Sequence, residues 1–126
     1  MRRDFDVKFS EFFESKIPFY LTLFDVNGVH NMNREKSYDA GDRLIKYVAS
    51  KILKASKGFV FRIGGDEFAS LSFDPVRFYD TDDNFVYASL CSDGYLDEKD
   101  FFDSVDIKLI EAKQQFYSTN EKDRRK

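Results

Sequence analysis

A pair of glycines, Gly64-Gly65, separates two short runs of β-favouring residues, and this feature constrains the fold more than any other in the chain. The first run is FVFRI at residues 59–63, and the second is EFASLSF at residues 67–73. Two strand patterns joined around a glycine pair predict a β-hairpin, because tight hairpin turns need residues that tolerate positive φ. We therefore expect a sheet that contains at least one antiparallel pair.

Apolar patterns predict further strands and helices on both sides of this hairpin. Residues 19–24 (FYLTLF) form a nearly continuous apolar run, which is typical of a strand buried on both faces in the middle of a sheet. Another strand is expected at 85–91, and apolar side chains at helical spacing predict helices at 4–15, 39–55 and 97–119. The order α-β-α-β-β-β-α indicates an α+β fold, with a mixed or antiparallel sheet and helices packed on it.

The spacing also predicts which side chains form the core. The single cysteine, Cys91, is expected to be a small buried hydrophobe and cannot form an intrachain disulfide, which is typical of a reducing compartment. The side chains expected on the inner faces of the three helices are Phe5, Phe9, Phe12 and Phe13, then Leu44, Ile45, Val48, Ile52 and Leu53, then Phe102, Val105, Leu109, Ala112 and Phe116.

Length and charge limit the class of protein. The 126 residues fit a single domain, 1–126, with a tail from about residue 120 expected to be disordered. The formal net charge of −3 gives no indication of a nucleic-acid partner. The stretch 74–106 is strongly acidic and the rest of the chain is basic, so a phosphate-rich ligand is expected away from that stretch. With no signal-peptide or membrane-spanning pattern, we expect a cytoplasmic protein without membrane association.

Carboxylates stand at two places where a sheet would present them. Asp25 ends the first predicted strand, and Asp66 and Glu67 follow the glycine pair. If that strand lies beside the hairpin, the carboxylates approach one another and repel unless a cation lies between them. Mg²⁺ takes one or two carboxylates with other oxygen ligands, and the Val26 carbonyl is a further candidate. On spacing alone, solvated charges at a hairpin tip and a strand end remain the competing interpretation.

Several motifs in order along the chain resemble the GGDEF family, whose active members are diguanylate cyclases. Gly64-Gly65-Asp66-Glu67-Phe68 is the GGDEF pentapeptide itself, and Arg62-Ile63 matches its usual lead-in. The segment 25–29 (DVNGV) is similar to the D-x-[DN]-x-[FL] turn of the family, and Asn33 falls eight residues after Asp25. The other matches are RRDF at 2–5, Gly41-Asp42 with Leu44, and Ala112-Lys113.

The resemblance implies a GGDEF-like fold, GTP as substrate, Mg²⁺ or Mn²⁺ as cofactor and a homodimer that makes cyclic di-GMP. Phosphoryl transfer at one site cannot join two nucleotides into a ring, so two domains would face each other. The implied metal ligands are Asp25, the Val26 carbonyl, Asp66 and Glu67, and Asp66 and Glu67 are also the implied catalytic residues. The implied nucleotide contacts are Gly28, Val29, His30, Asn33, Asp42, Gly64, Gly65 and Lys113.

The chain departs from the family pattern at several positions. His30 stands where the family has a phosphate-binding lysine, and a neutral imidazole weakens that contact. Tyr117 stands where an arginine is expected four residues after Lys113.

The largest departure is a gap, because the chain between Phe68 and Lys113 is shorter than in the family by about one helix and its loops. Without that helix, apolar sheet surface needs another cover, and an uncovered patch usually marks an interface. Either the shortened loop folds over the sheet or a partner chain does; Phe73, Phe78 and Phe85 are the candidate side chains.

Three functions are therefore open at this point. The first is an active diguanylate cyclase that works as a homodimer, supported by the intact motif residues Asp25, Asp66, Glu67, Asn33, Asp42 and Lys113. The second is a nucleotide-binding regulatory module without turnover, supported by His30, Tyr117 and the missing helix. The third is a dimerisation domain with a relic site, which the paired carboxylates argue against, because no structural need brings them together.

Overall fold

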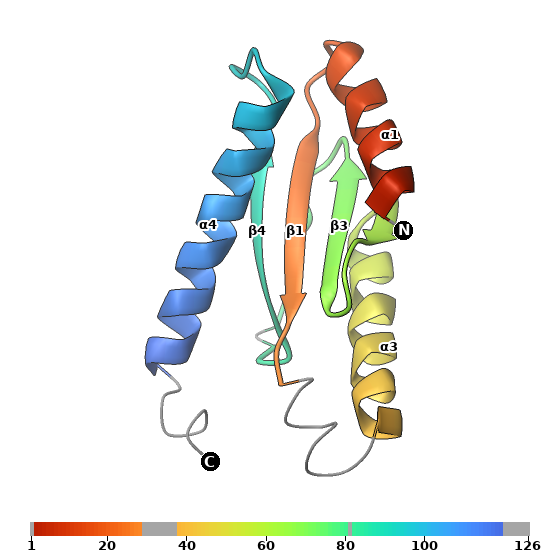
Figure 1. Cartoon of the computed structure of the whole chain (residues 1–126), viewed down its shortest axis with the longest axis vertical. Helices are drawn as coiled ribbons and strands as arrows, with labels where there is room; N and C mark the ends of the chain where they lie inside the picture. The colour runs from red at the N-terminus through yellow and green to blue at the C-terminus, as the bar shows by residue number, and fades with distance from the viewer. Residues whose placement is uncertain (1, 29–37, 81, 120–126) are drawn as a thin grey trace.

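The computed structural model describes residues 2–28, 38–80 and 82–119 and contains every helix and strand that the sequence predicts, each bounded within two residues of its expected position. Figure 1 shows the helices flanking a single sheet. The helices are α1 (Arg2–Glu14), α3 (Tyr38–Ala55) and α4 (Glu98–Thr119). The strands are β1 (Tyr20–Val26), β2 (Phe59–Arg62), β3 (Glu67–Ser72) and β4 (Phe85–Cys91).

The four strands form one sheet in the order β2-β3-β1-β4, and each of the three neighbouring pairs is antiparallel. The strand β1 lies between β3 and β4, as its continuous apolar run predicts, and six of its seven residues are buried. The predicted hairpin is formed by β2 and β3, and β3 places it directly beside β1. This α+β arrangement brings the end of β1 next to the hairpin turn.

One face of the sheet packs against α1 and α4. Alternation along the strands sends Leu21 and Leu23 of β1 to this face, where they meet the aromatic rings of both helices. Phe101 of α4 is fully buried there, with its ring centroid 5.6 Å from that of Phe19 and 6.0 Å from that of Phe9. The remaining buried members of this core are Phe5, Ala69, Leu71, Val86, Ala88, Val105 and Leu109.

The opposite face packs against α3 and the segment between β3 and β4. The strand residues Phe24 and Phe68 contact the apolar stripe of α3, which consists of Leu44, Ile45, Val48 and Ile52. The segment 73–84 contains no helix in the residues described, and it folds back so that Val76 is buried and Phe78 packs on Phe85. The sequence left open whether the shortened loop or a partner chain covers the sheet in place of the missing helix. The loop covers this part of the sheet.

Several expected core positions differ in the structure. Leu53 is 60% exposed, because it lies off the stripe that faces the sheet, and Cys91 is half-buried because it ends the edge strand β4. Phe73 does not cover the shortened face; it is exposed and stacks on Phe12 of α1. In α4 the fully buried aromatic ring is that of Phe101, and Phe102 is only partly buried.

The hairpin turn also differs from the expected geometry. Neither Gly64 nor Gly65 has a positive φ, so the expectation of a tight positive-φ turn is wrong. The connection is instead a four-residue loop, 63–66, in which Ile63 N donates to Glu67 O at 2.9 Å. The Arg62 guanidinium closes it by donating to the carbonyls of Gly64 and Gly65 at 3.3 and 2.5 Å.

Glycine is required at the start of the hairpin. A Cβ atom at Gly58 would lie 2.0 Å from the Leu71 carbonyl oxygen, far inside contact distance. The close approach lets β2 begin at Phe59 directly opposite Leu71.

None of the helices among the residues described is both long and apolar enough to span a membrane.

Candidate functional site

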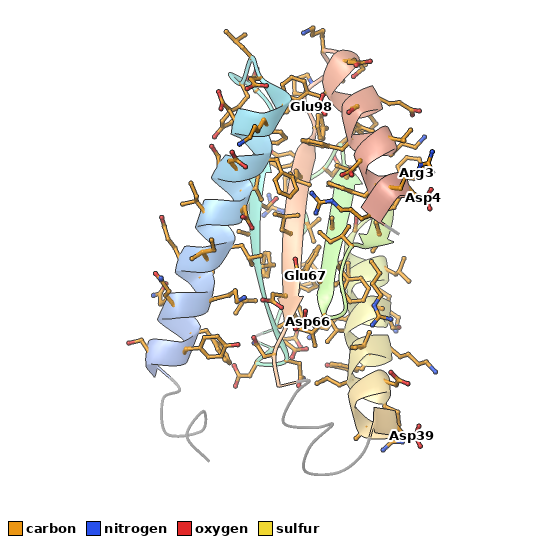
Figure 2. All side chains as sticks on the ribbon, viewed as in Figure 1. Arg3, Asp4, Asp39, Asp66, Glu67 and Glu98 are labelled. Carbon is orange, nitrogen blue, oxygen red and sulfur yellow. The ribbon has the colours of Figure 1, made fainter. Side chains whose placement is uncertain are left out.

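The sequence-predicted acids meet at one end of the molecule. There β1 ends, the β2–β3 hairpin turns and α3 begins, as Figure 1 shows at the bottom of the view. Figure 2 places Asp66 and Glu67 at this end, beside the terminus of β1. The C-terminal half of α4, which carries Lys113, runs toward the same end.

The pairing of β1 with β3 fixes the relation between the acids. Asp25 lies directly opposite Glu67, so both side chains belong to the face that packs against α4. One step further, Val26 N donates to the backbone carbonyl of Asp66 at 2.8 Å. The expectation that β1 runs beside the hairpin is confirmed, and it places three carboxylates within two residue pairs of one another.

A lysine from α4 completes this cluster. The Lys113 ammonium forms an ion pair with Asp25 Oδ2, and the Asp25 side chain is only 10% exposed. Burial raises the pKa of the Asp25 carboxyl above its ordinary value, the neighbouring Asp66 charge adds to this, and the lysine opposes it. The bond to Asp25 in turn raises the pKa of Lys113.

Glu67 is affected by the same charges. Its pKa is raised, first by burial and then by the charges of Asp25 and Asp66. The cluster therefore holds three acids against one nearby ammonium, and it keeps an excess of negative charge.

The donor set can be tested against a divalent cation. Within residues 2–28, 38–80 and 82–119, no three His, Cys, Asp or Glu side chains gather closely enough to hold a metal ion by themselves. Mg²⁺ does not need such a cage, because it is usually bound by one or two carboxylates together with substrate phosphates and water. Hard carboxylate oxygens under mutual repulsion at Asp25, Asp66 and Glu67 fit this mode of binding.

Asn27, in the turn after β1, forms two hydrogen bonds to the segment before β4. Asn27 N donates to Asn84 O at 2.7 Å, and its side-chain Nδ2 donates to Asp83 O at 3.1 Å. Asn27 is 8% exposed, and its Oδ1 accepts no hydrogen bond from any described residue. Gly28 follows with φ +80°, a conformation that L side chains rarely adopt, and no atom of residues 2–28, 38–80 or 82–119 lies within 4 Å of where a Cβ would stand.

The other predicted nucleotide contacts are distributed differently. Asp42 lies near the start of α3, exposed, and Gly65 is open on the side where a Cβ would stand. Gly64 has Glu67 3.4 Å from its would-be Cβ. Val29, His30 and Asn33 lie outside the described residues, so their predicted roles stay predictions.

Sequence reasoning missed the role of Asn27 as a buried structural residue. Its partners, Asp83 and Asn84, lie 56 and 57 positions away along the chain, so no local pattern could have indicated them. The bond from Lys51 to Asp82 was missed for the same reason, because the two residues lie 31 positions apart.

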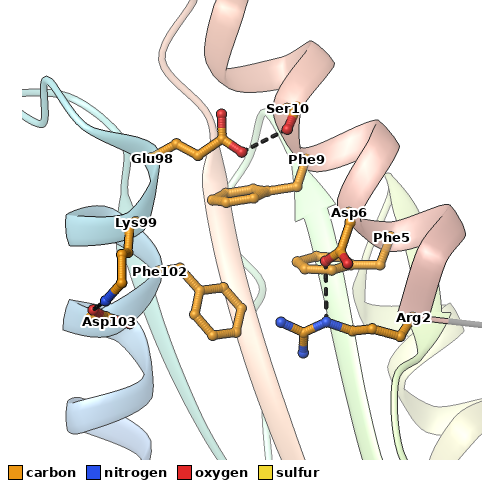
Figure 3. Close-up of a pocket in the computed structure, with 9 residues that line it drawn as sticks. All are labelled: Arg2, Phe5, Asp6, Phe9, Ser10, Glu98, Lys99, Phe102 and Asp103. Atoms are coloured by element: carbon orange, nitrogen blue, oxygen red, sulfur yellow. Dashed lines mark hydrogen bonds and ion pairs between the residues drawn. The ribbon is translucent and has the colours of Figure 1, made fainter.

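A separate cavity of about 250 Å³ lies between α1 and α4 (Figure 3). It is lined by Arg2, Phe5, Asp6, Phe9, Ser10, Glu98, Lys99, Phe102 and Asp103. Its polar groups pair with one another: Arg2 with Asp6 at 3.1 Å, Lys99 with Asp103 at 2.6 Å and Ser10 with Glu98 at 2.6 Å. The cavity contains none of the predicted site residues.

Comparison with known proteins gives one kind of match. The sequence matches no protein-family model and no curated protein. The structure matches the GGDEF domain of DgcB from Caulobacter crescentus, solved with c-di-GMP, at a TM-score of 0.74 and 19% identity, over 90% of this chain and 85% of that one. It matches the active GGEEF domain of a diguanylate cyclase from Vibrio cholerae at 0.68 and 18%, over 90% and 88%.

A third match is a microbial GGDEF domain described with cyclic di-GMP, at a TM-score of 0.73 and 16% identity, over 90% of this chain and 87% of the other. Identities this low establish the fold and leave the chemistry open. The resemblance first indicated by five consecutive residues is thus confirmed over nine-tenths of the chain: this protein has the fold of a GGDEF domain, shortened to 126 residues.

Proposed function

We propose that this chain binds GTP with Mg²⁺ or Mn²⁺ at the end of β1 and, as a homodimer, condenses two GTP molecules into cyclic di-GMP. The observation that carries the proposal is the cluster of Asp25, Asp66 and Glu67 around the junction of β1 and the hairpin. Nothing in the packing of the sheet requires three acids there, and burial, followed by the charges of neighbouring acids, raises the pKa of Asp25 and Glu67. Clusters of ionisable side chains with shifted pKa values are typical of functional sites.

The residues would divide the work by position. Asp25, Asp66 and the Val26 carbonyl would hold the cation, and Glu67 would hold it or accept the proton of the attacking 3′-hydroxyl. When bound, the cation would neutralise the charge that develops on the transferring phosphoryl group.

The nucleotide would be held by a second set of groups. Asp42 and Asn33 would recognise the guanine edge, while the amides of Gly28 and Val29, together with His30, would receive the phosphates. The open Gly64-Gly65 turn would let the nucleotide approach the backbone. Lys113 would reach the phosphates after exchanging its ion pair with Asp25 for the incoming cation. A substrate such as GTP places the reaction in the cytoplasm.

A second candidate function has its own support. A nucleotide-binding module without turnover is favoured by Lys113, which Asp25 holds, and by Tyr117, which stands where the family places an arginine. Both features reduce the positive charge offered to the phosphates. Neither feature removes a proposed metal ligand.

Two measurements on the purified protein test the proposal. Incubation with GTP and Mg²⁺ or Mn²⁺, followed by mass spectrometry, should give cyclic di-GMP in the wild type and none with Asp66→Ala. The matched control is Asp93→Ala, which removes an exposed acid in the loop between β4 and α4 and should leave product formation unchanged.

Binding of GTP with Mg²⁺ by calorimetry, without product, would support the second candidate. Absence of both binding and product would overturn the proposed function. Sedimentation with and without nucleotide adds a check, because a monomer under all conditions contradicts cyclase activity.

A further inference from the structure

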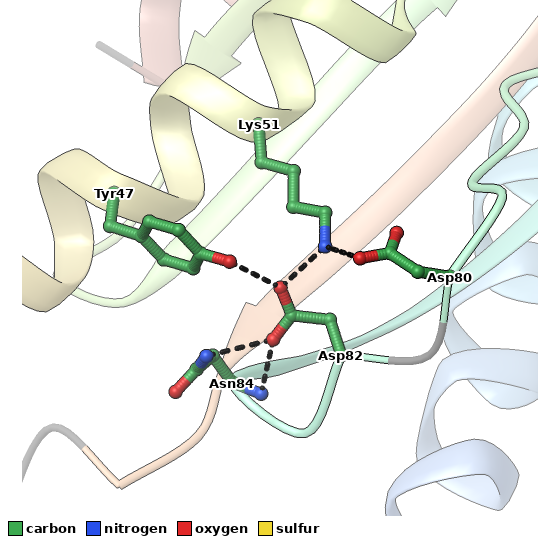
Figure 4. Close-up of polar contacts among 5 residues, drawn as sticks. All are labelled: Tyr47, Lys51, Asp80, Asp82 and Asn84. Atoms are coloured by element: carbon green, nitrogen blue, oxygen red, sulfur yellow. Dashed lines mark hydrogen bonds and ion pairs between the residues drawn. The ribbon is translucent and has the colours of Figure 1, made fainter.

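The segment that replaces the missing helix is fastened to α3 by a polar cluster, shown in Figure 4. Asp82 is its centre, and its side chain is only 5% exposed. One carboxylate oxygen, Oδ2, accepts from Lys51 Nζ at 2.7 Å and from Tyr47 OH at 2.9 Å. The other, Oδ1, accepts from the backbone N and side-chain Nδ2 of Asn84 at 2.9 and 2.8 Å. We refer to Tyr47, Lys51, Asp82 and Asn84 as the α3 clasp.

Apolar packing does not hold residues 82–84, the end of the segment between β3 and β4. Val76 and Phe78 anchor its first half in the core, but Tyr79 is 98% exposed and Asp83 is also exposed. With four charge-assisted hydrogen bonds, the buried carboxylate of Asp82 is therefore the principal attachment of residues 82–84 to α3.

The clasp continues into the turn after β1. The carbonyl of Asn84 accepts from Asn27 N at 2.7 Å, and the carbonyl of Asp83 accepts from Asn27 Nδ2 at 3.1 Å. Asn27 is buried and directly precedes Gly28, whose amide belongs to the proposed phosphate contacts. A continuous path of hydrogen bonds thus connects α3 to the nucleotide turn through Asp82.

We infer that Asp82 is a positioning residue for the nucleotide site: through Asn84 it fixes the Asn27–Gly28 turn in the conformation that receives the phosphates. This inference rests on the proposed function. Asp82 itself acts at a distance, because its carboxylate is fully engaged by the clasp. Loss of that carboxylate removes two hydrogen bonds of Asn84, so the carbonyls of Asp83 and Asn84 hold Asn27 and the turn less firmly.

Paired variants at the same lysine provide the test. Asp80 also bonds Lys51 Nζ, at 3.1 Å, but its side chain is 68% exposed and none of its hydrogen bonds described here reaches Asn84. Asp82→Ala should weaken binding of a non-hydrolysable GTP analogue with Mg²⁺ at least tenfold, measured by calorimetry. Asp80→Ala, the matched control, should change it less than twofold.

A second readout separates positioning from general destabilisation. In ¹⁵N-labelled, nucleotide-free protein, the Gly28 amide resonance should shift or broaden in Asp82→Ala and stay in place in Asp80→Ala. If Asp82→Ala does not fold, Lys51→Met keeps the side-chain stem and should produce the same changes in Gly28 and in binding, with a smaller amplitude.

The outcomes are distinguishable. A folded Asp82→Ala or Lys51→Met protein with unchanged analogue binding and an unchanged Gly28 resonance overturns the inference. A wild-type protein that binds no nucleotide overturns the proposed function, and the Gly28 resonance then still decides whether the clasp orients the turn.

Discussion

The face of the sheet against α1 and α4 is closed by two helices, whereas the opposite face is closed by α3 and by a segment without helical structure in the residues described. On the first face the strands β1, β3 and β4 present Leu, Ala and Val side chains to a cluster of phenylalanines. On the second face, the strands carry apolar side chains near the candidate site and polar side chains farther from it. These polar strand residues are Thr22, Ser70, Ser72 and Ser89.

The contrast shows that a loop can cover a sheet face in place of a helix when the strands present polar as well as apolar side chains to it. Thr22 Oγ1 and Ser89 Oγ lie 2.8 Å apart, and Ser72 Oγ donates to Asp74 O at 2.8 Å, so hydroxyl groups bond locally on the second face. The clasp around Asp82 adds buried charge to the same side. Apart from the Asp25–Lys113 ion pair at its end, the first face thus depends on apolar burial, and the second combines burial with specific polar contacts.

The largest effect is expected on the helix-covered face. Phe101→Ala removes a fully buried ring that contacts Phe9 of α1 and Phe19, the residue before β1, and it should lower the free energy of unfolding by about 3–5 kcal/mol in urea denaturation. Phe102→Ala, on the partly buried neighbouring position, serves as control and should cost less. Equal losses for the two variants would contradict the difference in burial.

A smaller effect is expected where the loop replaces the helix. Val76→Ala removes two buried methyl groups and should cost about 2 kcal/mol of unfolding free energy, because the segment acts as part of the core. Tyr79→Ala, at a side chain that is 98% exposed, should leave stability unchanged. If Val76→Ala behaves like Tyr79→Ala, the loop does not cover the sheet in solution.

The buried charge on the second face should appear as a dependence on pH. Hydrogen bonds from Lys51, Asn84 and Tyr47 outweigh the effect of burial and lower the pKa of Asp82 to about 2, below the value of about 3.9 for an unfolded chain. Its contribution to stability is therefore complete above about pH 4 and is lost as the pH falls toward 2.

Urea denaturation of the wild type and Asp82→Asn between pH 2 and 6 measures this contribution. The wild type should be the more stable protein above pH 4, and the difference between the two should shrink as the pH approaches 2. A difference that is constant over this range would show that Asp82 has an ordinary pKa in the folded protein.

The smallest effect concerns the hydroxyl groups themselves. Ser70 is fully buried, and its Oγ has no hydrogen-bond partner among the residues described. Ser70→Ala should leave the protein as stable as the wild type or stabilise it by up to about 1 kcal/mol, because an unsatisfied buried hydroxyl is removed. Thr22→Val breaks the bond to Ser89 and should instead destabilise slightly. Destabilisation of more than about 1 kcal/mol by Ser70→Ala would indicate that its hydroxyl has a partner.

Local patterns were sufficient to predict the elements and the meeting of the acids. The apolar run 19–24 identified the central strand, and the glycine pair identified the hairpin beside it. From the sequence, Asp25 approaches Asp66 and Glu67 only if these two elements are neighbours, and the pairing of β1 with β3 meets that condition.

Other features depend on contacts that no local pattern reveals. The predictions of Leu53 as a core residue and of Phe102 in place of Phe101 were wrong, because spacing alone does not determine how far a helix is rotated about its axis when it packs. The hairpin turn without positive φ at Gly64 and Gly65 is accompanied by bonds from the Arg62 side chain to their carbonyls, which strand patterns do not indicate. The pairing of Lys113 with Asp25 and the clasp around Asp82 join distant parts of the chain.

The close approach of Gly58 to the Leu71 carbonyl has a consequence at the far end of the hairpin. Any side chain there would force β2 away from β3 or shift it along its neighbour. A shift of one residue reverses the face on which each side chain stands. The absence of a Cβ atom at Gly58 thereby controls the alignment of β2, the strand that leads into the Gly64-Gly65 turn. The four residues of β2 lie between Gly58 and that turn.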